Sequence, residues 1–461
     1  MDSYITHSTI SDPKKAVQQI KTTNFERPLG GIESSWSNFY DIAPINAVTT
    51  LKVEGPLTEN LLRIVLDRLQ ARHPLAQVRI VKQKGNLFLT NKNVGKIPLQ
   101  SYIVKDFAAY KKIIGYEYDT PFDYEKGPLL RACLVKLENE PNSQYIVLNY
   151  MHTIGDGESV MNLSYEIMDM CREIVLGNAD FRLKALEAAP VAEKNFPARI
   201  KTWRMKWNFL KFLGRQLKDQ YWYRHKMIFN SRKLKHSQLR TGSLEKALPK
   251  TDLKKALAGA KANGANMHGA ACSALLCAEY EYYCKKYKTE KSIYLKCSSV
   301  VNLRTFLDAP ISSEHYGSYV SMVASSHQIK QRVDFWQLAR DIKTELVAGL
   351  KRDDHFCVSM YAKPLSKLVV KLDLAVISAL SVSNVGRMKF GSDFGPFQLT
   401  EYIGNVSNLG GGSNLSVVLN TFAGTMYWSY TYAKPLISDE EVDGIATVSY
   451  THLTLPTTLV V

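Results

Sequence analysis

Apolar residues run almost without interruption over Tyr145–Met151, which predicts a buried strand. Gly155 and Gly157 then break the pattern, and apolar positions recur at helical spacing over Val160–Ile174. His152 therefore directly follows a predicted buried strand and precedes a glycine-rich turn. Such a position presents a side chain at an open edge of a rigid scaffold, which is a common place for binding and catalysis.

The same pattern predicts two α/β halves separated by a segment of different character. The first half covers residues 40–185. It includes the predicted helix Glu59–Ala71 and the predicted strands Asn46–Val53, Gln77–Val81, Cys133–Leu137 and Tyr145–Met151. The second half covers residues 246–447. Its predicted helices are Leu253–Ala260, Met267–Lys286 and Phe335–Leu350. Its predicted strands are Ser292–Val301 and Ala375–Val382, followed by a hairpin of Asn414–Thr421 and Thr425–Tyr432. Residues 1–40 show no regular pattern, so we expect them to be irregular.

Residues 186–245, between the halves, are predicted to form a linker that contains a basic amphipathic helix. The helix around Trp203–Tyr221 places aromatic and aliphatic residues near one face, with lysine and arginine over much of the rest. Two interpretations fit this pattern. The helix is either a crossover that packs its aromatic face on the two domains, or a surface that contacts an anionic membrane.

Composition places the chain among ordinary globular proteins. Its 461 residues, 45% hydrophobic and 22% charged, suffice for two or three domains with normal cores. No apolar run reaches the eighteen residues of a membrane span, and Met1–Thr6 has no basic region followed by an apolar one. The seven cysteines are scattered without a Cys-x-x-Cys pair, which fits free thiols in a reducing compartment. We therefore expect a cytoplasmic protein.

The formal net charge of +16 indicates a negatively charged partner or solvated lysine faces. Because the chain has no recognised nucleic-acid motif, we expect no nucleic-acid partner. Partners of matching charge are an anionic membrane surface, the phosphates of coenzyme A and an acidic acyl carrier protein. The sequence shows no cluster of metal ligands, so we expect no metal.

His152 opens the pattern His-x-x-x-Asp-Gly, which ends at Asp156 and Gly157. A neutral imidazole takes a proton from a hydroxyl or an amine as that group attacks a thioester, provided that the ring is held in one orientation. A final glycine suits a tight turn and leaves room for substrates. Taken alone, a histidine at a strand end fits equally well as a hydrogen-bonded, buried histidine.

Five short motifs occur in order along the chain, and together they carry a family resemblance. They are Arg-His-Pro-Leu at 72–75, Pro-Phe-Asp at 121–123, His-x-x-x-Asp-Gly at 152–157, Asn-Leu-Arg at 302–304 and Ser-Asn-x-Gly-Arg at 383–387. This set resembles the large acyltransferase superfamily of chloramphenicol acetyltransferase. That superfamily includes condensation domains of nonribosomal peptide synthetases, plant BAHD acyltransferases, and free-standing alcohol and phthiocerol acyltransferases. The resemblance extends from about Arg27 to Ile445.

The resemblance implies an α/β fold of two chloramphenicol-acetyltransferase-like sandwich domains, arranged as a V-shaped monomer with a tunnel between them. The N-terminal domain is then residues 1–185, the linker with its basic helix is 186–245, and the C-terminal domain is 246–447. An acyl thioester reaches one face of the tunnel, and an alcohol or amine acceptor reaches the opposite face. No metal or permanently bound cofactor is implied, because acyl-CoA or a phosphopantetheinyl thioester on an acyl carrier protein is the co-substrate.

The same resemblance implies roles for individual residues. His152 is the general base, while Asp156 turns away from the substrate and pairs with Arg304. A planar guanidinium suits this place because its fork binds a carboxylate at two points. Ser383 or Asn384, near the tunnel, is a candidate donor to the tetrahedral oxyanion. The alternative is that Asn384 and Gly386 only shape a turn.

The favoured function is that of a free-standing acyltransferase, which moves an acyl group from a CoA or carrier-protein thioester to a hydroxyl acceptor. Condensation domains and many free-standing relatives have a second histidine directly before the catalytic one, where this chain has Met151. This difference weakens the case for peptide-bond formation. Two alternatives stay open: a stand-alone condensation-type enzyme that forms an amide on carrier-bound substrates, and a catalytically silent domain that docks carrier proteins.

The end of the chain, residues 448–461, is set apart from the rest. Val448–Leu453 reads Val-Ser-Tyr-Thr-His-Leu, which is the translation of GTC-TCT-TAT-ACA-CAT-CTG, a stretch of a transposase-end sequencing adapter. We therefore expect these residues to be foreign to an assembled environmental gene and exclude them from the argument. The helix predicted to start at Ser438–Val442 is then incomplete.

Overall fold

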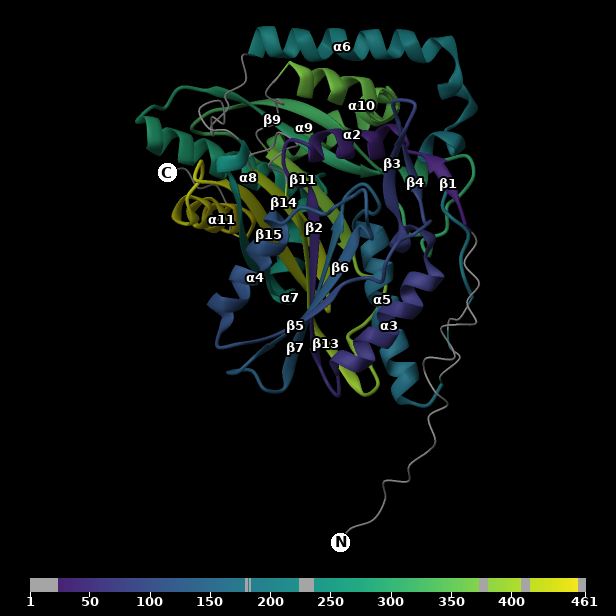
Figure 1. The fold of residues 1–461 in the computed structure, drawn as a ribbon. Helices are drawn as coiled ribbons and strands as arrows, with labels where there is room; N and C mark the ends of the chain where they lie inside the picture. The colour runs from purple at the N-terminus through teal and green to yellow at the C-terminus, as the bar shows by residue number, and fades with distance from the viewer. Residues whose placement is uncertain are drawn as a thin grey trace.

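Two six-stranded sheets, each with helices against it, organise the chain (Figure 1). The computed structural model describes residues 24–178, 181, 184–223, 236–372, 380–407 and 415–454. Besides the two large sheets, three short strands form a small sheet in the order β1-β4-β3, with the bounds β1 (Glu26–Pro28), β4 (Asn86–Thr90) and β3 (Arg79–Gln83). The two large sheets confirm the predicted α/β class with two lobes.

The first large sheet, here called the N-lobe sheet, is buried on both faces. In its strand β7, Ile146 and Leu148 belong to one hydrophobic core, whereas Tyr145 and Val147 belong to another. Because successive side chains of a strand point to opposite faces, burial of both faces explains the near-continuous apolar run before His152. In spatial order the strands are β12 (Asp393–Phe394), β13 (Phe397–Val406), β2 (Asn46–Glu54), β7 (Ser143–Met151), β6 (Leu130–Leu137) and β5 (Leu99–Val104).

Helices cover both faces of the N-lobe sheet. Helix α3 (Glu59–Arg72) packs beside α5 (Gly157–Val175) over one core, and α4 (Phe107–Asp119) packs over the other. The side chain of Thr58 accepts a hydrogen bond from the backbone N–H of Leu61 at 3.1 Å, which caps α3. Helix α3 therefore begins at the residue that the sequence predicts.

The second large sheet, here called the C-lobe sheet, packs against α8 (Met267–Tyr287) and further helices. Small residues let α8 approach its neighbours closely, since a Cβ atom added at Gly269 would lie 2.5 Å from the Ala339 carbonyl oxygen. The strands in order are β10 (Val320–Ile329), β9 (Ile293–Asn302), β11 (Leu380–Arg387), β14 (Leu415–Phe422), β15 (Thr425–Lys434) and β8 (Arg240–Leu248). The further helices include α7 (Lys250–Ala262), α9 (Phe335–Lys351) and α11 (Asp439–Thr454).

Strands β12 and β13 come from the C-terminal part of the chain, yet they complete the N-lobe sheet. Strand β13 pairs antiparallel with β2, so that Ile403 lies opposite Thr50. Strand β8 spans the predicted division between residues 245 and 246 and joins the C-lobe sheet. The sheets therefore do not follow the domain boundaries expected from the sequence, because pairing joins strands that are far apart along the chain.

The predicted strand Ala375–Val382 is found as β11, whose described part starts at Leu380 and continues to Arg387. The first five residues of that prediction, 375–379, lie outside the described residues. The strand predicted at Asn414–Thr421 corresponds to β14, and Asn414 itself is likewise outside them.

Helix α2 (Gly31–Tyr40) occupies part of the segment that the sequence suggested to be irregular, so that expectation is wrong there. Glu33 caps the helix, because its Oε2 accepts a hydrogen bond from the backbone N–H of Gly30 at 2.8 Å. Helix α2 packs against α10 (Asp354–Lys371). The hydrophobic pattern misses α2 because most of its buried residues are polar, namely Glu33, Ser34, Ser35 and Ser37.

Helix α6 (Trp203–Tyr223) is the predicted basic amphipathic helix, and it lies along α10 at the top of the view in Figure 1. It packs through Met205 and Phe209, whereas Trp203 and Trp207 are 69% and 56% exposed. The interpretation as a crossover that packs its aromatic face on the two domains is therefore wrong about that face. Among the residues that the structure describes, no helix has the length and apolar character needed to cross a bilayer.

The last helix, α11, continues through Thr454 and so includes part of the segment 448–461 that the sequence sets apart. Leu453 is buried in the C-lobe core, and the hydroxyl of Tyr450 donates a hydrogen bond to Asp252 Oδ2 at 2.9 Å. The foreign origin of this segment stays a prediction, and its residues 455–461 lie outside the described part of the chain.

Candidate active site

His152 directly follows strand β7, and backbone hydrogen bonds fix the turn that carries it. Its N–H donates to the Ile45 carbonyl oxygen at 3.1 Å, and the Ile154 N–H donates to the Met151 carbonyl oxygen at 3.0 Å. The imidazole Nδ1 lies 2.8 Å from the Gly155 carbonyl oxygen. Because a carbonyl oxygen only accepts, this bond places the ring proton on Nδ1 and leaves the Nε2 lone pair as a base.

Trp36, from helix α2, holds the face of the same imidazole. The two rings are stacked, with 4.8 Å between their centroids and 14° between their planes. Tyr316 packs closely against Gly155, since a Cβ atom at this glycine would lie 2.6 Å from the Tyr316 hydroxyl oxygen. The stack fixes the plane of the His152 ring and the carbonyl fixes its rotation, so the imidazole has one orientation.

The surroundings of His152 also control its charge. Burial lowers the pKa of His152 from its ordinary value of 6.5, against the raising effects of the Gly155 carbonyl and of the Asp156 carboxylate. The ring is therefore predominantly neutral at pH 7. A neutral imidazole in a fixed tautomer is the form that accepts a proton.

Asp156 turns into the protein and caps helix α5. Its Oδ1 accepts a hydrogen bond from the Ser159 N–H at 2.9 Å, as expected of an aspartate at a helix N-cap. Its Oδ2 accepts from Arg304 Nη1 at 2.8 Å and from the Tyr319 N–H at 2.7 Å. The structure thus brings Asp156 and Arg304 together, and the carboxylate has its acceptors filled by three donors.

Arg304 joins the two halves of the chain, and the two terminal nitrogens of its guanidinium bind different groups. While Nη1 binds Asp156, Nη2 donates to Ser159 Oγ at 2.8 Å and to the Gly317 carbonyl oxygen at 3.3 Å. The guanidinium also lies over the Tyr319 ring, 4.6 Å from its centroid. The prediction that the guanidinium binds the Asp156 carboxylate at two points is therefore wrong. Only Nη1 binds the carboxylate, because Nη2 binds the hydroxyl of Ser159 on helix α5.

The ionisation of this pair follows from its contacts. Burial works to raise the pKa of Asp156, but the Arg304 charge and the hydrogen bonds from Arg304, Ser159 and Tyr319 outweigh it and lower that pKa. Burial likewise works to lower the pKa of Arg304, and the Asp156 charge outweighs it and raises that pKa. Both groups are charged at pH 7, and each supplies the counter-charge that the other needs in a buried place.

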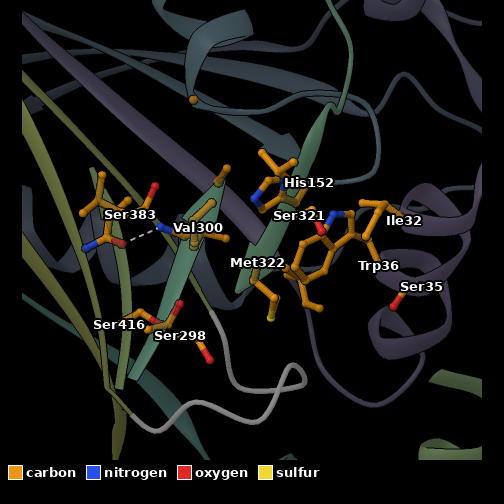
Figure 2. Close-up of a pocket in the computed structure, with 18 of the residues that line it drawn as sticks. Ile32, Ser35, Trp36, His152, Ser298, Val300, Ser321, Met322, Ser383 and Ser416 are labelled. Atoms are coloured by element: carbon orange, nitrogen blue, oxygen red, sulfur yellow. Dashed lines mark hydrogen bonds between the residues drawn. The ribbon is translucent and has the colours of Figure 1, made fainter. Parts of the chain in front are cut away.

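A cavity of about 400 Å³ lies between the lobes, and His152 and Trp36 line it (Figure 2). Its walls come from strands of both large sheets and from helices α2, α5, α6 and α10. Most of the lining is apolar, with members such as Val160, Val300 and Leu365. A largely apolar cavity with a few polar groups is the usual form of a small-molecule site.

A row of serines crosses the C-lobe wall of this cavity. Ser298 of β9, Ser381 of β11 and Ser416 of β14 stand in register on adjacent strands, and all three line the cavity. Figure 2 shows the labelled serines Ser298, Ser383 and Ser416 on the side opposite Trp36. The serines form a polar strip on the wall of a mostly apolar cavity. Their small side chains leave space in the cavity, and their hydroxyl groups are able to hydrogen-bond.

The structure separates the two residues proposed for the oxyanion. Ser383 lines the cavity, whereas Asn384 is not part of the lining. The Asn384 Oδ1 accepts a hydrogen bond from the Gly386 N–H at 3.0 Å, at an irregularity in the pairing of β11 with β14. Asn384 and Gly386 lie within strand β11, so the interpretation that they only shape a turn is wrong, although Asn384 does shape the backbone locally.

Gly157 begins helix α5 at the cavity wall. A Cβ atom at this position would lie 3.2 Å from Val385 Cγ2, and both residues line the cavity. The glycine therefore keeps β11 close to the start of α5. Among the residues that the structure describes, no group of three His, Cys, Asp or Glu side chains is placed to hold a metal ion.

A family model described as "Condensation domain" matches residues 44–355, which is more than half of the chain. The chain belongs to the condensation domain family. The matched range contains His152, Asp156 and Arg304. None of the curated protein sequences matches this chain at a significant level.

Solved structures with the same fold include an acetyltransferase and condensation domains of synthetases. TRI3 trichothecene 15-O-acetyltransferase from Fusarium sporotrichioides is 9% identical, with a TM-score of 0.72 over 94% of this chain and 95% of that chain. The first condensation domain of the CDA synthetase is 14% identical, with a TM-score of 0.68 over 93% and 95%. A mutant of the starter condensation domain of rhizomide synthetase RzmA, in complex with C8-CoA, is 12% identical, with a TM-score of 0.66 over 93% and 94%. At such identities these likenesses show the fold.

Sequence reasoning missed Trp36 and the serine row. Trp36 lies in a segment without an apolar pattern, so its place beside His152 depends on how α2 packs. The serines have a weak signal, because Ser298, Ser381 and Ser416 occupy positions in strands where a larger apolar residue is usual. The side of the sheet on which these serines lie is known only once the strands are paired.

Proposed function

We propose that this protein is a free-standing acyltransferase in which His152 is the general base. The observation that carries the proposal is a neutral, oriented imidazole at an apolar cavity of about 400 Å³ between the lobes. Such a lining suits an acyl chain better than a highly charged molecule. The donor is an acyl thioester of CoA or of an acyl carrier protein, and the acceptor is a hydroxyl group.

In the proposed reaction His152 Nε2 removes the proton of the hydroxyl as its oxygen attacks the thioester carbonyl carbon. A carbon–oxygen bond forms, and the carbonyl electron pair moves to the oxygen to give a tetrahedral oxyanion. When the oxyanion collapses, the carbon–sulfur bond breaks and the leaving thiolate takes the proton from the imidazolium. The products are an ester and a free thiol, and His152 is again neutral.

The other site residues support this step from fixed positions. Asp156 and Arg304 hold the start of helix α5, and with it the turn between His152 and Gly157, without contacting the substrate. Ser383, which lines the cavity, is the proposed donor to the oxyanion. Asn384 is not proposed for this role, since its side chain binds the backbone of its own strand.

Amide formation on carrier-bound substrates is the second candidate, and membership of the condensation domain family favours it. The same base serves an amine acceptor. Met151 occupies the position before the catalytic histidine and is fully buried, so it packs beneath the turn instead of facing the cavity. A third possibility, a silent domain that docks carrier proteins, is disfavoured by the complete set of His152 with its hydrogen bond and Asp156 with Arg304.

Release of the thiol tests these candidates directly. The protein is incubated with acyl-CoA of increasing chain length, and the free thiol is followed with dithionitrobenzoate, with an alcohol or a matched amine as acceptor. Alcohol-dependent release supports the proposed function. Release only from a carrier-bound thioester with an amine supports the amide-forming enzyme. Carrier binding without turnover of any thioester supports the silent domain.

Two histidine variants make a matched control. His152→Ala strongly lowers the rate of alcohol-dependent thiol release if the imidazole is the base. His315→Ala removes a histidine that is not part of the cavity lining, and we expect it to leave the rate unchanged. Equal rates for the two variants contradict the assignment of His152.

A further inference from the structure

Helix α6 presents a row of large apolar side chains to solvent along its outer face. Positions three, four and seven apart share one face of a helix, and the row follows this spacing. The exposed fractions of its members lie between 56% and 70%, and the members are Trp203, Trp207, Leu210, Leu217 and Tyr221. The helix has 21 residues, which corresponds to a length of about 30 Å. Contiguous apolar surface of this extent marks a binding face.

The opposite face of α6 is packed, so the exposure of the outer row is not due to a loosely placed helix. Phe209 stacks on Tyr361 of α10, with 3.6 Å between ring centroids and 12° between planes. Arg215 forms an ion pair with Asp354 at the start of α10. Met205 is buried. These contacts fix the rotation of the helix and direct the aromatic row outward.

Basic side chains flank the apolar row. The exposed cations of the helix are Arg204, Lys206, Lys211 and Lys218. The one acidic residue of α6, Asp219, lies on the inner side and is partly buried. The outer face is thus apolar along its middle and positive along its flanks, on a protein with a net charge of +16. This is the charge and apolar pattern of helices that lie in the interface of an anionic bilayer.

Helix α10 continues this surface. Helices α6 and α10 run antiparallel, since Phe209 meets Tyr361 and Arg215 meets Asp354. Beyond Tyr361, in the direction of the α6 N-terminus, α10 exposes Pro364 and again leucines and lysines, namely Lys367, Leu368, Lys371 and Leu372 at its C-cap. Two neighbouring helices therefore expose the same combination of side chains.

The two helices also form a wall of the cavity at His152. Phe212 of α6 lines the cavity, as do Val358, Leu365 and Val369 of α10. These residues belong to the inner faces of the same helices that expose the apolar and basic surface. The outer surface and the cavity are thus separated by the thickness of one helix pair.

We propose that the outer face of α6, with the end of α10, docks the protein on an anionic lipid surface. Docking places the cavity next to the bilayer, so the substrate that it serves is lipid-soluble: a long acyl chain or a membrane-partitioned alcohol. This second statement rests on the proposed acyltransferase function, whereas docking itself does not. An acidic partner protein is disfavoured, because two tryptophans, a tyrosine and two leucines occupy the middle of the face, and charge lies only on its flanks.

Sedimentation with vesicles tests docking. The full-length protein is mixed with vesicles of phosphatidylcholine alone or with 30% phosphatidylglycerol, at low and at raised salt. We expect binding to the anionic vesicles, weakened by salt because the screening length shortens. No sedimentation with anionic vesicles at low salt, or equal binding to neutral vesicles, overturns the proposal. So does a salt-sensitive complex with an acidic carrier protein in the absence of vesicle binding.

Two charge variants of equal net charge separate the face from the overall charge of the protein. The first reverses three lysines of α6, as Lys206→Glu, Lys211→Glu and Lys218→Glu. The control reverses three exposed lysines of the C lobe, as Lys254→Glu, Lys261→Glu and Lys285→Glu. Since each cation near the surface contributes substantially to lipid affinity, the first variant loses about a hundredfold in affinity and the control far less. Equal losses contradict a defined docking face.

The tryptophans report insertion directly. Brominated lipids quench tryptophans that lie in the interface, so we expect quenching of the native fluorescence in anionic vesicles. Trp203→Phe with Trp207→Phe keeps the aromatic row and therefore binds, but loses most of the quenching. Trp203→Ala with Trp207→Ala also loses affinity. The variant retains the exposed Trp222 of α6, so unchanged quenching shows that the part of the row carrying Trp203 and Trp207 does not enter the interface, and this overturns the proposed docking face.

Activity measurements separate this inference from the proposed function. With a short acyl-CoA and a water-soluble alcohol, without vesicles, the lysine-reversal variant of α6 turns over like the unchanged protein. With a long-chain alcohol held in anionic vesicles it loses most of its rate, whereas the C-lobe control retains it. Equal losses in both assays overturn the link between docking and substrate. If no acyl thioester reacts at all, the proposed function fails, and vesicle binding still decides docking.

Discussion

The indole of Trp36 stacks on the imidazole of His152, with 4.8 Å between the ring centroids. Trp36 comes from helix α2 and His152 directly follows strand β7, so the placement of α2, which packs against α10, orients the proposed base. A helix that closes one side of the cavity thereby also controls the geometry of the reaction centre.

Removal of this stack is expected to lower turnover without removing the base. Trp36→Ala frees one face of the imidazole, and we expect kcat to fall by about tenfold or more, since positioning of the catalytic group is lost. Trp36→Phe retains an aromatic face and keeps most of the rate. Steady-state kinetics with an acyl-CoA and an alcohol measure both. An alanine variant as active as the phenylalanine variant contradicts the role of the stack.

His152→Ala is expected to lower turnover by about 10²–10⁴-fold, the usual contribution of a positioned general base. The fold is retained, because the ring lies at a cavity edge and its side-chain hydrogen bond is to the neighbouring Gly155 carbonyl. Met151→Ala affects turnover much less, although it costs stability through the loss of a fully buried side chain. Circular dichroism and thiol release distinguish the two. A Met151 variant with the larger loss of turnover would reverse the assignment.

The pH dependence of the rate follows from the lowered pKa of His152. Because burial favours the neutral ring, the active form is already populated below the ordinary histidine pKa of 6.5. The value of kcat/KM should rise with pH through a single ionisation below 6.5 and then level off. A profile from pH 4.5 to 8.5 tests this. A midpoint above 6.5 is the result that contradicts a buried, neutral base.

Asp156→Asn is expected to damage stability more than chemistry. The substitution leaves the buried Arg304 without its counter-charge, and breaking such a pair costs roughly 3–5 kcal/mol. Denaturant unfolding measures the loss. Asp123→Asn is the control, since its partner Lys126 is exposed and exposed pairs contribute little. Equal free energies of unfolding for the two variants contradict the structural role of Asp156.

His355 makes the stability of the folded protein depend on pH. Burial lowers its pKa to about 4 from 6.5, and neither ring nitrogen has a hydrogen-bond partner within the described structure. Between these two values the unfolded chain binds a proton that the folded chain excludes. Stability is therefore lost as pH falls from 6.5 toward 4, by up to roughly 3 kcal/mol from this residue.

The variant His355→Phe removes this titration but keeps an aromatic ring beside Phe306 and Phe356. The slope of the unfolding free energy between pH 4.5 and 6.5 is the quantity to compare, because any cost of the larger ring is the same at each pH. We expect a shallower slope in the variant, with part of the slope remaining from His327, whose pKa burial also lowers to about 4. An unchanged slope contradicts the prediction.

Periodicity predicted the strand before His152, and the family resemblance of the ordered motifs implied the two-lobed α/β fold and the pairing of Asp156 with Arg304. These features depend on local pattern, or on a resemblance that covers nearly the whole chain. The hydrogen bond from Arg304 Nη2 to Ser159 was not predictable, because the Ser159 hydroxyl reaches this nitrogen only when helix α5 is folded and packed. The outward face of α6 was not predictable either, since the helix has apolar residues on both sides and sequence alone does not say which side packs.

Strand β13 has a consequence for how the chain is made. During synthesis β2 leaves the ribosome early, but its neighbour β13 follows only with residues 397–406. Until then one edge of β2 has free backbone groups, and such an edge pairs readily with other chains. The N lobe therefore reaches its final sheet only near the end of translation. A chain that is released early keeps an open, aggregation-prone edge however well its first half has folded.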